Sequence, residues 1–301
     1  MGRILIGTTS WTEKTLIESG RFYPEGATTA EARLRYYAGR FPLVEVDSSY
    51  YALPAERNAR LWVQRTPEGF TFDVKAFRLF THHQTPPAAL PKDVRRALGP
   101  VEKKHVYYRD LPEELLAELW ARFRAALEPL REAGKLGVVL LQFPPWFVYR
   151  RANLAYLAEC ARRLEGRRVA VELRHRSWLD LRHRDEVLAF ERDHELAHVV
   201  VDGPQGFASS VPPVWEVTRR EIAVVRLHGR NRETWEKKGL SAAQRFRYLY
   251  SEEELEELAA PIRGLAAASD EVHVLFNNCY RDFAQRNAVQ LARWIGEPPG
   301  G

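Results

Sequence analysis

The sequence of 301 residues contains little sulfur: one methionine and two cysteines, Cys160 and Cys279. Two cysteines cannot build a disulfide framework or a four-thiolate metal site, so we expect both thiols to be reduced. Long apolar stretches are missing as well, because no run approaches the ~18 residues that a membrane span needs. The chain passes directly into Arg3-Ile4-Leu5-Ile6-Gly7 without a signal-peptide pattern. These absences predict a cytoplasmic protein that has no membrane partner.

Lysine is scarce among the basic residues, since eight of the 45 are Lys and the others are Arg. The formal net charge of +5 permits nucleic acid or another polyanion as a partner. A preference for Arg suits phosphate recognition, but a compositional habit or a hot habitat produces the same bias. The hydrophobic share of 45% and the charged share of 28% are those of an ordinary folded protein, which excludes disordered and fibrous classes.

Eight short runs of β-branched and apolar residues recur along the chain, as expected for strands that are covered on both faces. The runs are 4–8, 43–47, 70–75, 137–142, 169–173, 197–201, 222–227 and 272–276. Helical patterns at 55–65, 112–133, 153–164, 184–195 and 283–295 separate most of them. Capping boxes at Thr28-x-x-Glu31 and Ser251-x-x-Glu254 begin two more helices. Repeated strand–helix units with right-handed crossovers predict a parallel (β/α)₈ TIM barrel, as one domain over residues 1–301.

Two segments interrupt this rhythm. Residues 76–111 form a long insertion after the third strand, and we expect it to lie over the barrel mouth as a lid, because the loops that follow barrel strands carry function. Residues 203–220, between the sixth and seventh strands, show no helical period. We therefore expect this connection to be irregular, with its helix missing or reduced to a turn.

Polar and aromatic residues stand at or just after the carboxyl ends of the predicted strands, where barrels of this class build their active sites. They are Trp11, Glu45, Asp47, Tyr50, Lys75, Gln142, Glu172, Arg174, Trp178, Asp202, Arg226, His228, Asn277 and Asn278. The two-residue period of a strand places Glu45 and Asp47 on one face. The same period places Glu172 and Arg174 on one face of strand five. It also places Arg226 and His228 on one face of strand seven. Buried charges need partners, so this ring either binds a ligand or is an internal salt-bridge network that closes the barrel.

Several motifs follow one another in an order that resembles a known family. They are Gly7-Thr8-Thr9-Ser10-Trp11, Phe22-Tyr23-Pro24, residues 44–51 (VEVDSSYY), residues 66–70 (TPEGF), Gln142-Phe143-Pro144-Pro145, residues 171–178 (VELRHRSW), Arg226-Leu227-His228-Gly229 and Phe276-Asn277-Asn278. This order, over essentially the whole chain, resembles the family called domain of unknown function 72 (DUF72), also named YecE-like. The sequence departs from that pattern at Asp47, Ser48 and Cys279. The resemblance implies a TIM-barrel fold and names no reaction.

The strand-end residues suit acid/base chemistry on an anion. Glu45, Asp47, Glu172 and His228 are the catalytic candidates, since carboxylates in different surroundings can hold different pKa values. Lys75, Arg174, Arg226 and His228 are candidates for an anion clamp. The aromatic residues at the mouth, with Trp146 and Trp235, suit a base or a sugar ring, and the remaining polar residues would complete the binding. The leading prediction is a hydrolase or lyase acting on a small anionic, ring-containing substrate.

Two other interpretations remain open. Carboxylates and an imidazole also suit Mn²⁺, Mg²⁺ or Zn²⁺, which would make the chain a metal-dependent phosphodiesterase or nucleic-acid repair enzyme. The candidate ligands are Glu45, Asp47, Glu172, Asp202 and His228, and His82-His83 in the insertion could join them. The third interpretation is a non-catalytic protein that binds a nucleotide or nucleic acid at the same mouth.

Overall fold

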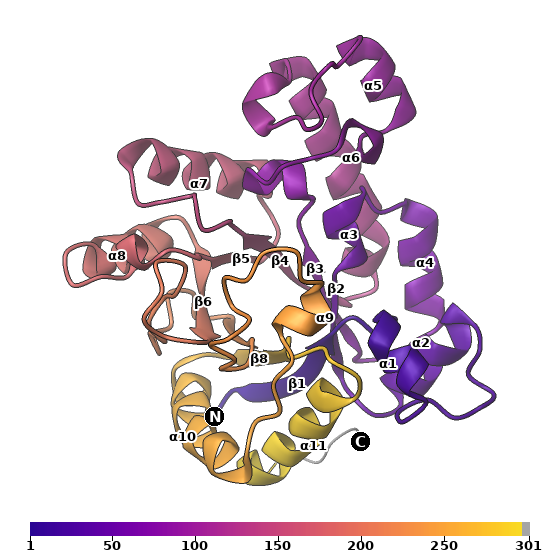
Figure 1. Cartoon of the computed structure of the whole chain (residues 1–301), viewed down its shortest axis with the longest axis vertical. Helices are drawn as coiled ribbons and strands as arrows, with labels where there is room; N and C mark the ends of the chain where they lie inside the picture. Colours follow the sequence, from indigo (N-terminus) through magenta and orange to yellow (C-terminus); the bar gives the residue numbers. More distant parts are fainter. Residues whose placement is uncertain (297–301) are drawn as a thin grey trace.

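The computed structural model describes residues 1–296. Its eight strands form a closed barrel in which every neighbouring pair is parallel and β8 pairs with β1. The strands are β1 (Arg3–Thr9), β2 (Leu43–Val46), β3 (Thr71–Lys75), β4 (Leu136–Gln142), β5 (Val169–Glu172), β6 (Leu196–Asp202), β7 (Ala223–Leu227) and β8 (Glu271–Phe276). Figure 1 shows the barrel surrounded by helices. The predicted TIM barrel is confirmed, with every predicted strand in place.

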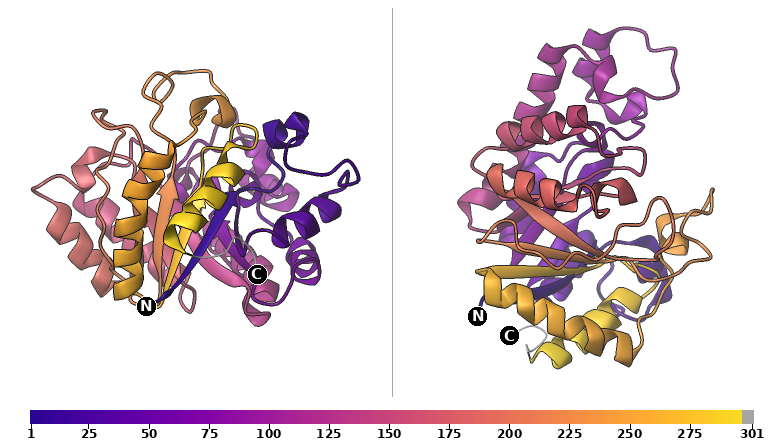
Figure 2. Two further views of the ribbon diagram at one scale, coloured as in Figure 1. Left: turned by 90° about the horizontal axis from the view of Figure 1, so that it is seen from below. Right: turned by 90° about the vertical axis from the view of Figure 1, so that its left-hand side faces the viewer.

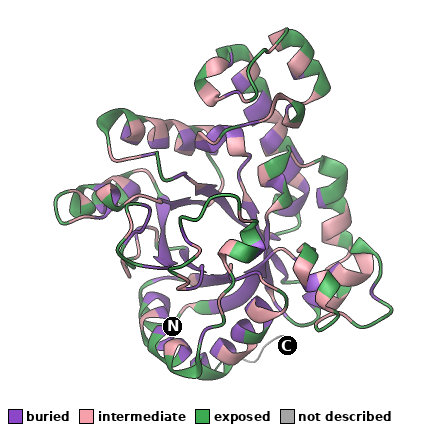
Figure 3. Ribbon diagram, in the orientation of Figure 1, coloured by how far each residue is buried: buried purple, intermediate pink, exposed green. Residues whose placement is uncertain are grey.

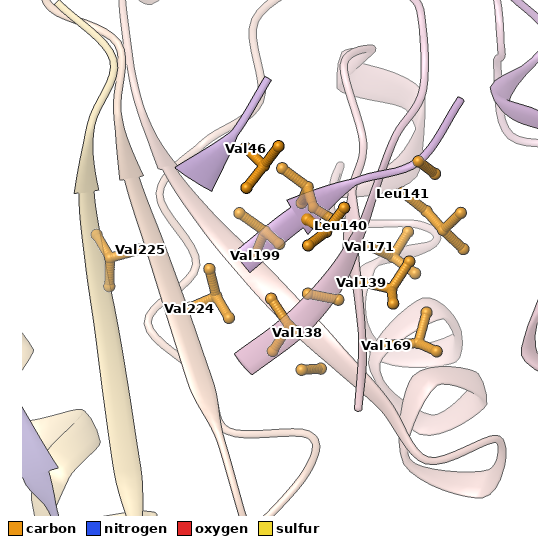
Figure 4. Packing of buried hydrophobic residues seen from close by; sticks show 14 of the residues in the cluster. Val46, Val138, Val139, Leu140, Leu141, Val169, Val171, Val199, Val224 and Val225 are labelled. Atoms are coloured by element: carbon orange, nitrogen blue, oxygen red, sulfur yellow. The ribbon is translucent and has the colours of Figure 1, made fainter. Parts of the chain in front are cut away.

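The strands read as apolar runs because both of their faces are covered. All seven residues of β6 are buried, and in the other strands only residues at the strand ends are not (Figure 3). Helices cover the outer face, while side chains fill the interior of the barrel. Branched side chains of several strands, among them Val46, Val171 and Val199, belong to one large buried apolar cluster (Figure 4).

The helices lie between the strands. They are α1 (Lys14–Ser19), α2 (Ala30–Ala38), α3 (Ser48–Tyr51), α4 (Glu56–Gln64), α5 (Lys92–Leu98), α6 (Glu113–Glu132), α7 (Arg151–Arg163), α8 (Arg184–Asp193), α9 (Ala242–Arg245), α10 (Glu252–Ala268) and α11 (Phe283–Ile295). Of these, α1, α3, α5 and α9 were not predicted, because each is too short to show a helical period. Over residues 1–296, no helix has both the length and the apolar character that crossing a membrane requires.

One predicted capping box forms and the other does not. Ser251 accepts from the backbone N–H of Glu254, whose side chain accepts from the backbone of Ser251, as predicted. At α2 the cap is Thr29 instead, which accepts from the N–H of Ala32. The prediction of a cap at Thr28 was wrong because the backbone N–H of that residue is still hydrogen-bonded within the preceding turn, to Gly26.

The two interrupted segments differ in how they are built. Residues 203–222 form no helix, as predicted, and Thr218 anchors this connection by donating to the carbonyl of Leu196 at the start of β6. The insertion begins at the mouth with a 3₁₀ turn, η1 (Arg78–Thr81). Its more distant part, with α5, packs beside α6 through an ion pair between Asp93 and Arg122, away from the barrel axis (Figure 1).

A different connection lies across the mouth. Residues 228–251, between β7 and α10, carry α9 and rise beyond the carboxyl ends of the strands, opposite the N-terminus (Figure 2, left). Figure 1 shows α9 in front of the open end of the barrel. We refer to this connection as the roof. It covers the residues that the sequence places at the strand ends, whereas a lid role for the insertion remains a prediction.

A buried ion pair that the sequence did not reveal lies inside the barrel, toward the amino ends of the strands. Asp73 and His273 lie 2.9 Å apart, from Oδ2 to Nδ1, and the other ring nitrogen of His273 lies 2.8 Å from Glu271 Oε1. Asp73 also accepts from the backbone N–H of Val138, where the register between β3 and β4 shifts. A Cβ at Gly137 would lie 2.1 Å from Asp73 Oδ1, so only glycine fits there. This network fastens β3, β4 and β8 together.

Candidate functional site

The centre of the candidate site is the side chain of Arg226 on β7, which is fully buried. Its Nε and Nη2 donate to the two carboxylate oxygens of Glu45 on β2, at 2.9 and 2.6 Å. Its Nη1 donates to Glu172 at the end of β5. The planar fork of a guanidinium fits such paired contacts, which a lysine could not make. Arg226 therefore links three strands across the barrel.

The carboxylate of Glu172 collects the largest number of donors. Beside Arg226, its Oε1 accepts from Gln142 Nε2 at 2.7 Å, from Arg174 Nη1 at 3.1 Å and from His228 Nε2 at 3.0 Å. Burial would raise the pKa of Glu172, but Arg226 and His228 hold it well below its usual range. Glu172 is therefore ionised at neutral pH.

The imidazole of His228 is held at both ring nitrogens. Burial lowers its pKa to about 4, so the ring is neutral at physiological pH and Nε2–H donates to Glu172. Its Nδ1 accepts from Asn277 Nδ2 at 2.7 Å, and Asn277 Oδ1 accepts from Thr9 Oγ1 at 2.8 Å. These contacts select one tautomer. The result is a chain of hydrogen bonds that runs from Glu172 through His228 and Asn277 to Thr9.

The two buried glutamates differ in protonation. Burial raises the pKa of Glu45 to about 7, in spite of its paired contact with Arg226. Two carboxyl groups that share one guanidinium but titrate far apart are the arrangement that acid/base catalysis uses.

Three cations surround the opening above this network, and we refer to Lys75, Arg78 and Arg174 as the rim cations. Lys75 Nζ lies 3.0 Å from Asp47 Oδ1 and 4.6 Å from the centre of the Tyr50 ring. The guanidinium of Arg78 lies 5.1 Å from the same ring. Within residues 1–296, Arg78 has no carboxylate within 4 Å, and Lys75 and Arg174 have one each. The rim therefore has positive charge to spare for an anion.

The roof seals the network from above. The guanidinium of Arg174 lies 4.7 Å from the centre of the Trp235 ring. Phe246 stacks on His228, with 5.4 Å between the ring centres. Sequence reasoning placed Trp235 at the mouth but missed Phe246, Thr9 and Arg78. Thr9 alone had a readable signal, because it shares the inward face of β1 with residues 5 and 7.

Two of the predicted site residues point away from the barrel interior. Asp202 accepts from the Tyr250 hydroxyl at 2.6 Å and pairs with Arg230 at 3.0 Å. Asn278 donates to the backbone of Tyr248 and to Asn287 of α11, both at 2.9 Å. The two-residue period explains this orientation, because residues 201 and 277 face inward and their successors therefore face the helices. A ligand-binding role for either residue stays a prediction.

Two predicted aromatic residues also belong to the packing. Trp11 is almost fully buried and meets Trp62 edge-on at 5.9 Å between ring centres. Trp178 is completely buried, and its Nε1 donates to the carbonyl of Phe147 at 2.6 Å. Neither ring offers a face to a ligand. Tyr50 lies at the mouth as predicted, together with Trp146.

The anion-clamp and metal hypotheses change accordingly. Nε, Nη1 and Nη2 of Arg226 already donate to carboxylates, so a ligand anion would meet the rim cations instead. The guanidinium also occupies the place between Glu45 and Glu172 that a metal ion would need. Throughout the described part of the chain, no group of three His, Cys, Asp or Glu side chains is arranged to hold a metal ion.

The spacing His-Glu-x-x-His does occur, at residues 194–198, and sequence reasoning overlooked it. In metalloproteases this spacing binds zinc because both histidines lie on one face of a helix. Here α8 ends at Asp193 and β6 begins at Leu196, so the motif spans a helix end and a strand. His198 instead contacts Glu191, at 3.1 Å. This spacing forms no zinc site.

Comparison with known proteins identifies the family. The model of the family described as "Protein of unknown function DUF72" matches residues 5–300. The UPF0759 protein YunF of Bacillus subtilis is 33% identical over 291 residues, which cover 96% of this chain and 93% of that protein. A DUF72 family protein of Thermotoga maritima has a solved structure that is 31% identical, with a TM-score of 0.76 and coverage of 98% of this chain and 100% of that one. For a DUF72 family protein of Enterococcus faecalis the values are 27% identity, a TM-score of 0.79 and coverage of 97% and 95%. The chain therefore belongs to the DUF72 family.

Proposed function

We propose that this chain is an enzyme that binds a small, anionic, ring-containing substrate at the carboxyl end of the barrel and acts on it by acid/base chemistry, as a hydrolase or lyase. One observation carries the proposal: three rim cations converge on the opening above the buried glutamates, and within residues 1–296 one of them, Arg78, has no carboxylate partner. A network that only closed the barrel would need no such excess of positive charge, because a charge that is shielded from water and has no partner destabilises the fold.

The rim and the network meet at Arg174. Its Nη1 donates to Glu172, so an anion bound to the free side of this guanidinium would lie next to that carboxylate. Glu172 and its neutral partner His228 are the groups that would exchange protons with such a substrate. Glu45, with a pKa of about 7, can store or release a proton behind them. The roof residues Trp235 and Phe246 exclude water from these groups, which strengthens their electrostatic interactions.

The binding half of the proposal is tested by thermal shift. The purified protein is screened against nucleoside monophosphates, sugar phosphates and aromatic carboxylates, and each stabilising compound is titrated. Arg174→Gln should weaken binding at least tenfold, because the site loses a charged fork. Arg182→Gln, on the exposed surface, is the matched control and should bind as the parent does. Equal affinity in the parent and Arg174→Gln would refute the site.

The catalytic half is tested by following each bound compound by mass spectrometry. Glu172→Gln should retain binding and lose turnover by a factor of about 10² to 10⁴, which is the usual contribution of a general acid or base. Binding without turnover in the parent would instead favour the non-catalytic interpretation. A strongly salt-dependent affinity for oligonucleotides would then identify nucleic acid as the ligand.

A further inference from the structure

A second hollow opens beside the mouth, between η1 and the end of the insertion. It has a volume of about 320 Å³ and is lined by His82, Gln84, Tyr107, Tyr108, Arg109 and Trp146. This volume lies at the lower end of the range for small-molecule sites. We infer that this hollow, the ring pocket, binds the planar heteroaromatic ring of the substrate while the anionic group of the same molecule lies on the rim cations. The inference rests on the proposed function and names its substrate class: nucleotide-like molecules.

The walls of the ring pocket are preorganised by contacts within the chain. The backbone of His82 is left-handed, with φ at 58°, a conformation that non-glycine residues rarely hold and that clusters at ligand sites. Its ring lies 4.2 Å from that of Tyr156 and 5.8 Å from that of Tyr108, between ring centres. Burial lowers the pKa of His82 to about 4, so the pocket wall is a neutral ring at physiological pH. A neutral, flat wall favours stacking over charge pairing.

Trp146 supplies an open stacking face. Its side chain is 56% exposed, although Trp is normally a largely buried residue. The ring is nevertheless held in place, because Nε1 donates to the carbonyl of His82 at 3.2 Å. An exposed indole whose orientation is already fixed loses little entropy when a flat ring stacks on it.

Arg109 supplies hydrogen-bond donors at the edge of the same pocket. Its guanidinium lies 5.9 Å from the centre of the Tyr107 ring. Among residues 1–296, no carboxylate lies within 4 Å of it, whereas Arg122 of α6 and Arg163 of α7 each contact carboxylates. A guanidinium without a partner can donate to the nitrogen and carbonyl acceptors along the edge of a heteroaromatic ring. Aromatic walls with a free donor distinguish this pocket from a purely apolar hollow.

The ring pocket and the rim adjoin through His83. Its ring lies 5.9 Å from that of Trp146 and 5.2 Å from that of Tyr50, the residue on which Lys75 and Arg78 rest. Burial and the positive charges of the rim cations lower the pKa of His83 to about 3. The cations therefore face this histidine. A molecule that has a ring at one end and a phosphate at the other can occupy both places at once.

The test uses three probes in calorimetric titrations: adenosine, inorganic phosphate and adenosine 5′-monophosphate. The nucleotide should bind more tightly than either fragment. Trp146→Ala and Arg109→Gln should weaken adenosine and the nucleotide at least tenfold and leave phosphate unchanged. Arg174→Gln should weaken phosphate and the nucleotide and leave adenosine unchanged. Trp294→Ala, which removes another partly exposed indole on α11, is the matched control and should bind all three probes as the parent does.

The outcomes separate this inference from the proposed function. If adenosine fails to bind, or binds equally well to Trp146→Ala and Trp294→Ala, the ring pocket is refuted whatever phosphate does. If phosphate fails to bind while adenosine depends on Trp146, the anion site of the proposed function is refuted and the ring pocket stands. Trp146→Phe should recover most of the adenosine affinity, because it restores an aromatic face at the same position.

Discussion

Replacement of Glu45 by Gln should change how the stability of the protein depends on pH. The pKa of the buried Glu45 carboxyl rises from an ordinary value of 4.5 to about 7 on folding, because burial penalises the charge more than Arg226 stabilises it. Between these two pH values the folded chain holds a proton that the unfolded chain has lost. The stabilising contribution of this proton is complete below pH 4.5 and is lost as the pH rises through 7.

The size of the effect follows from the same two values. The difference between 4.5 and about 7, at about 1.4 kcal/mol for each pH unit, corresponds to about 3 kcal/mol. Glutamine has no proton to lose, so Glu45→Gln lacks this pH dependence. Relative to the variant, the parent should therefore lose about 3 kcal/mol of unfolding free energy between pH 4.5 and pH 8. All other titrating groups are common to both proteins and cancel in the comparison.

Urea denaturation of the parent and Glu45→Gln, at half-unit steps from pH 4.5 to pH 8.5, measures this difference directly. Glu172→Gln is the control, because the pKa of Glu172 is held well below its usual range and the group is ionised in both states from about pH 6 upward. From about pH 6 to pH 8.5 its stability difference from the parent should be flat. A flat difference for Glu45→Gln as well would refute the reasoning, since it would mean that Arg226 outweighs burial.

Three further predictions concern the buried polar groups. Asp73→Asn should lower the unfolding free energy by about 3 to 5 kcal/mol, because it removes one buried carboxylate from the protonated His273 and leaves Glu271 as its only ionic partner. The pKa of His273 is about 9, raised by Asp73 and Glu271 against the effect of burial, so the parent should lose stability as the pH rises from about 6.5 through 9 in thermal unfolding, and the variant should lose less. Arg226→Lys should lower the unfolding free energy, measured by urea denaturation, by at least about 2 kcal/mol, since an ammonium cannot contact two carboxylates at once as the guanidinium does. Unchanged stability would mean that the charge alone matters. Tyr250→Phe should lower the unfolding free energy by about 1 to 3 kcal/mol in the same measurement, because it leaves the buried N–H of Gly229 without an acceptor. An unchanged unfolding free energy would show that another group replaces the hydroxyl.

The positions of the site residues were more predictable than the contacts between their side chains. The strand-end positions of Glu45, Glu172, Arg226 and His228 could be predicted, because parallel strands bring their carboxyl ends to one side of the barrel. The choice between inward and outward positions failed at Asp202, which ends β6 one residue past the inward-facing Val201. The sequence does not show whether a polar residue at a strand end faces the barrel interior or the helices.

The fold could be predicted from the sequence alone. Each strand is a local apolar run and each long helix a local amphipathic pattern, so neighbouring residues carry the information and the order of the elements implies the barrel. Which charges meet, in contrast, depends on the tertiary structure. Arg226 contacts Glu45 across 181 positions of sequence, and Asp73 contacts His273 across 200. Such contacts depend on the register of strands that are distant in sequence, on the closure of β8 against β1 and on the roof above them, and no local pattern records these.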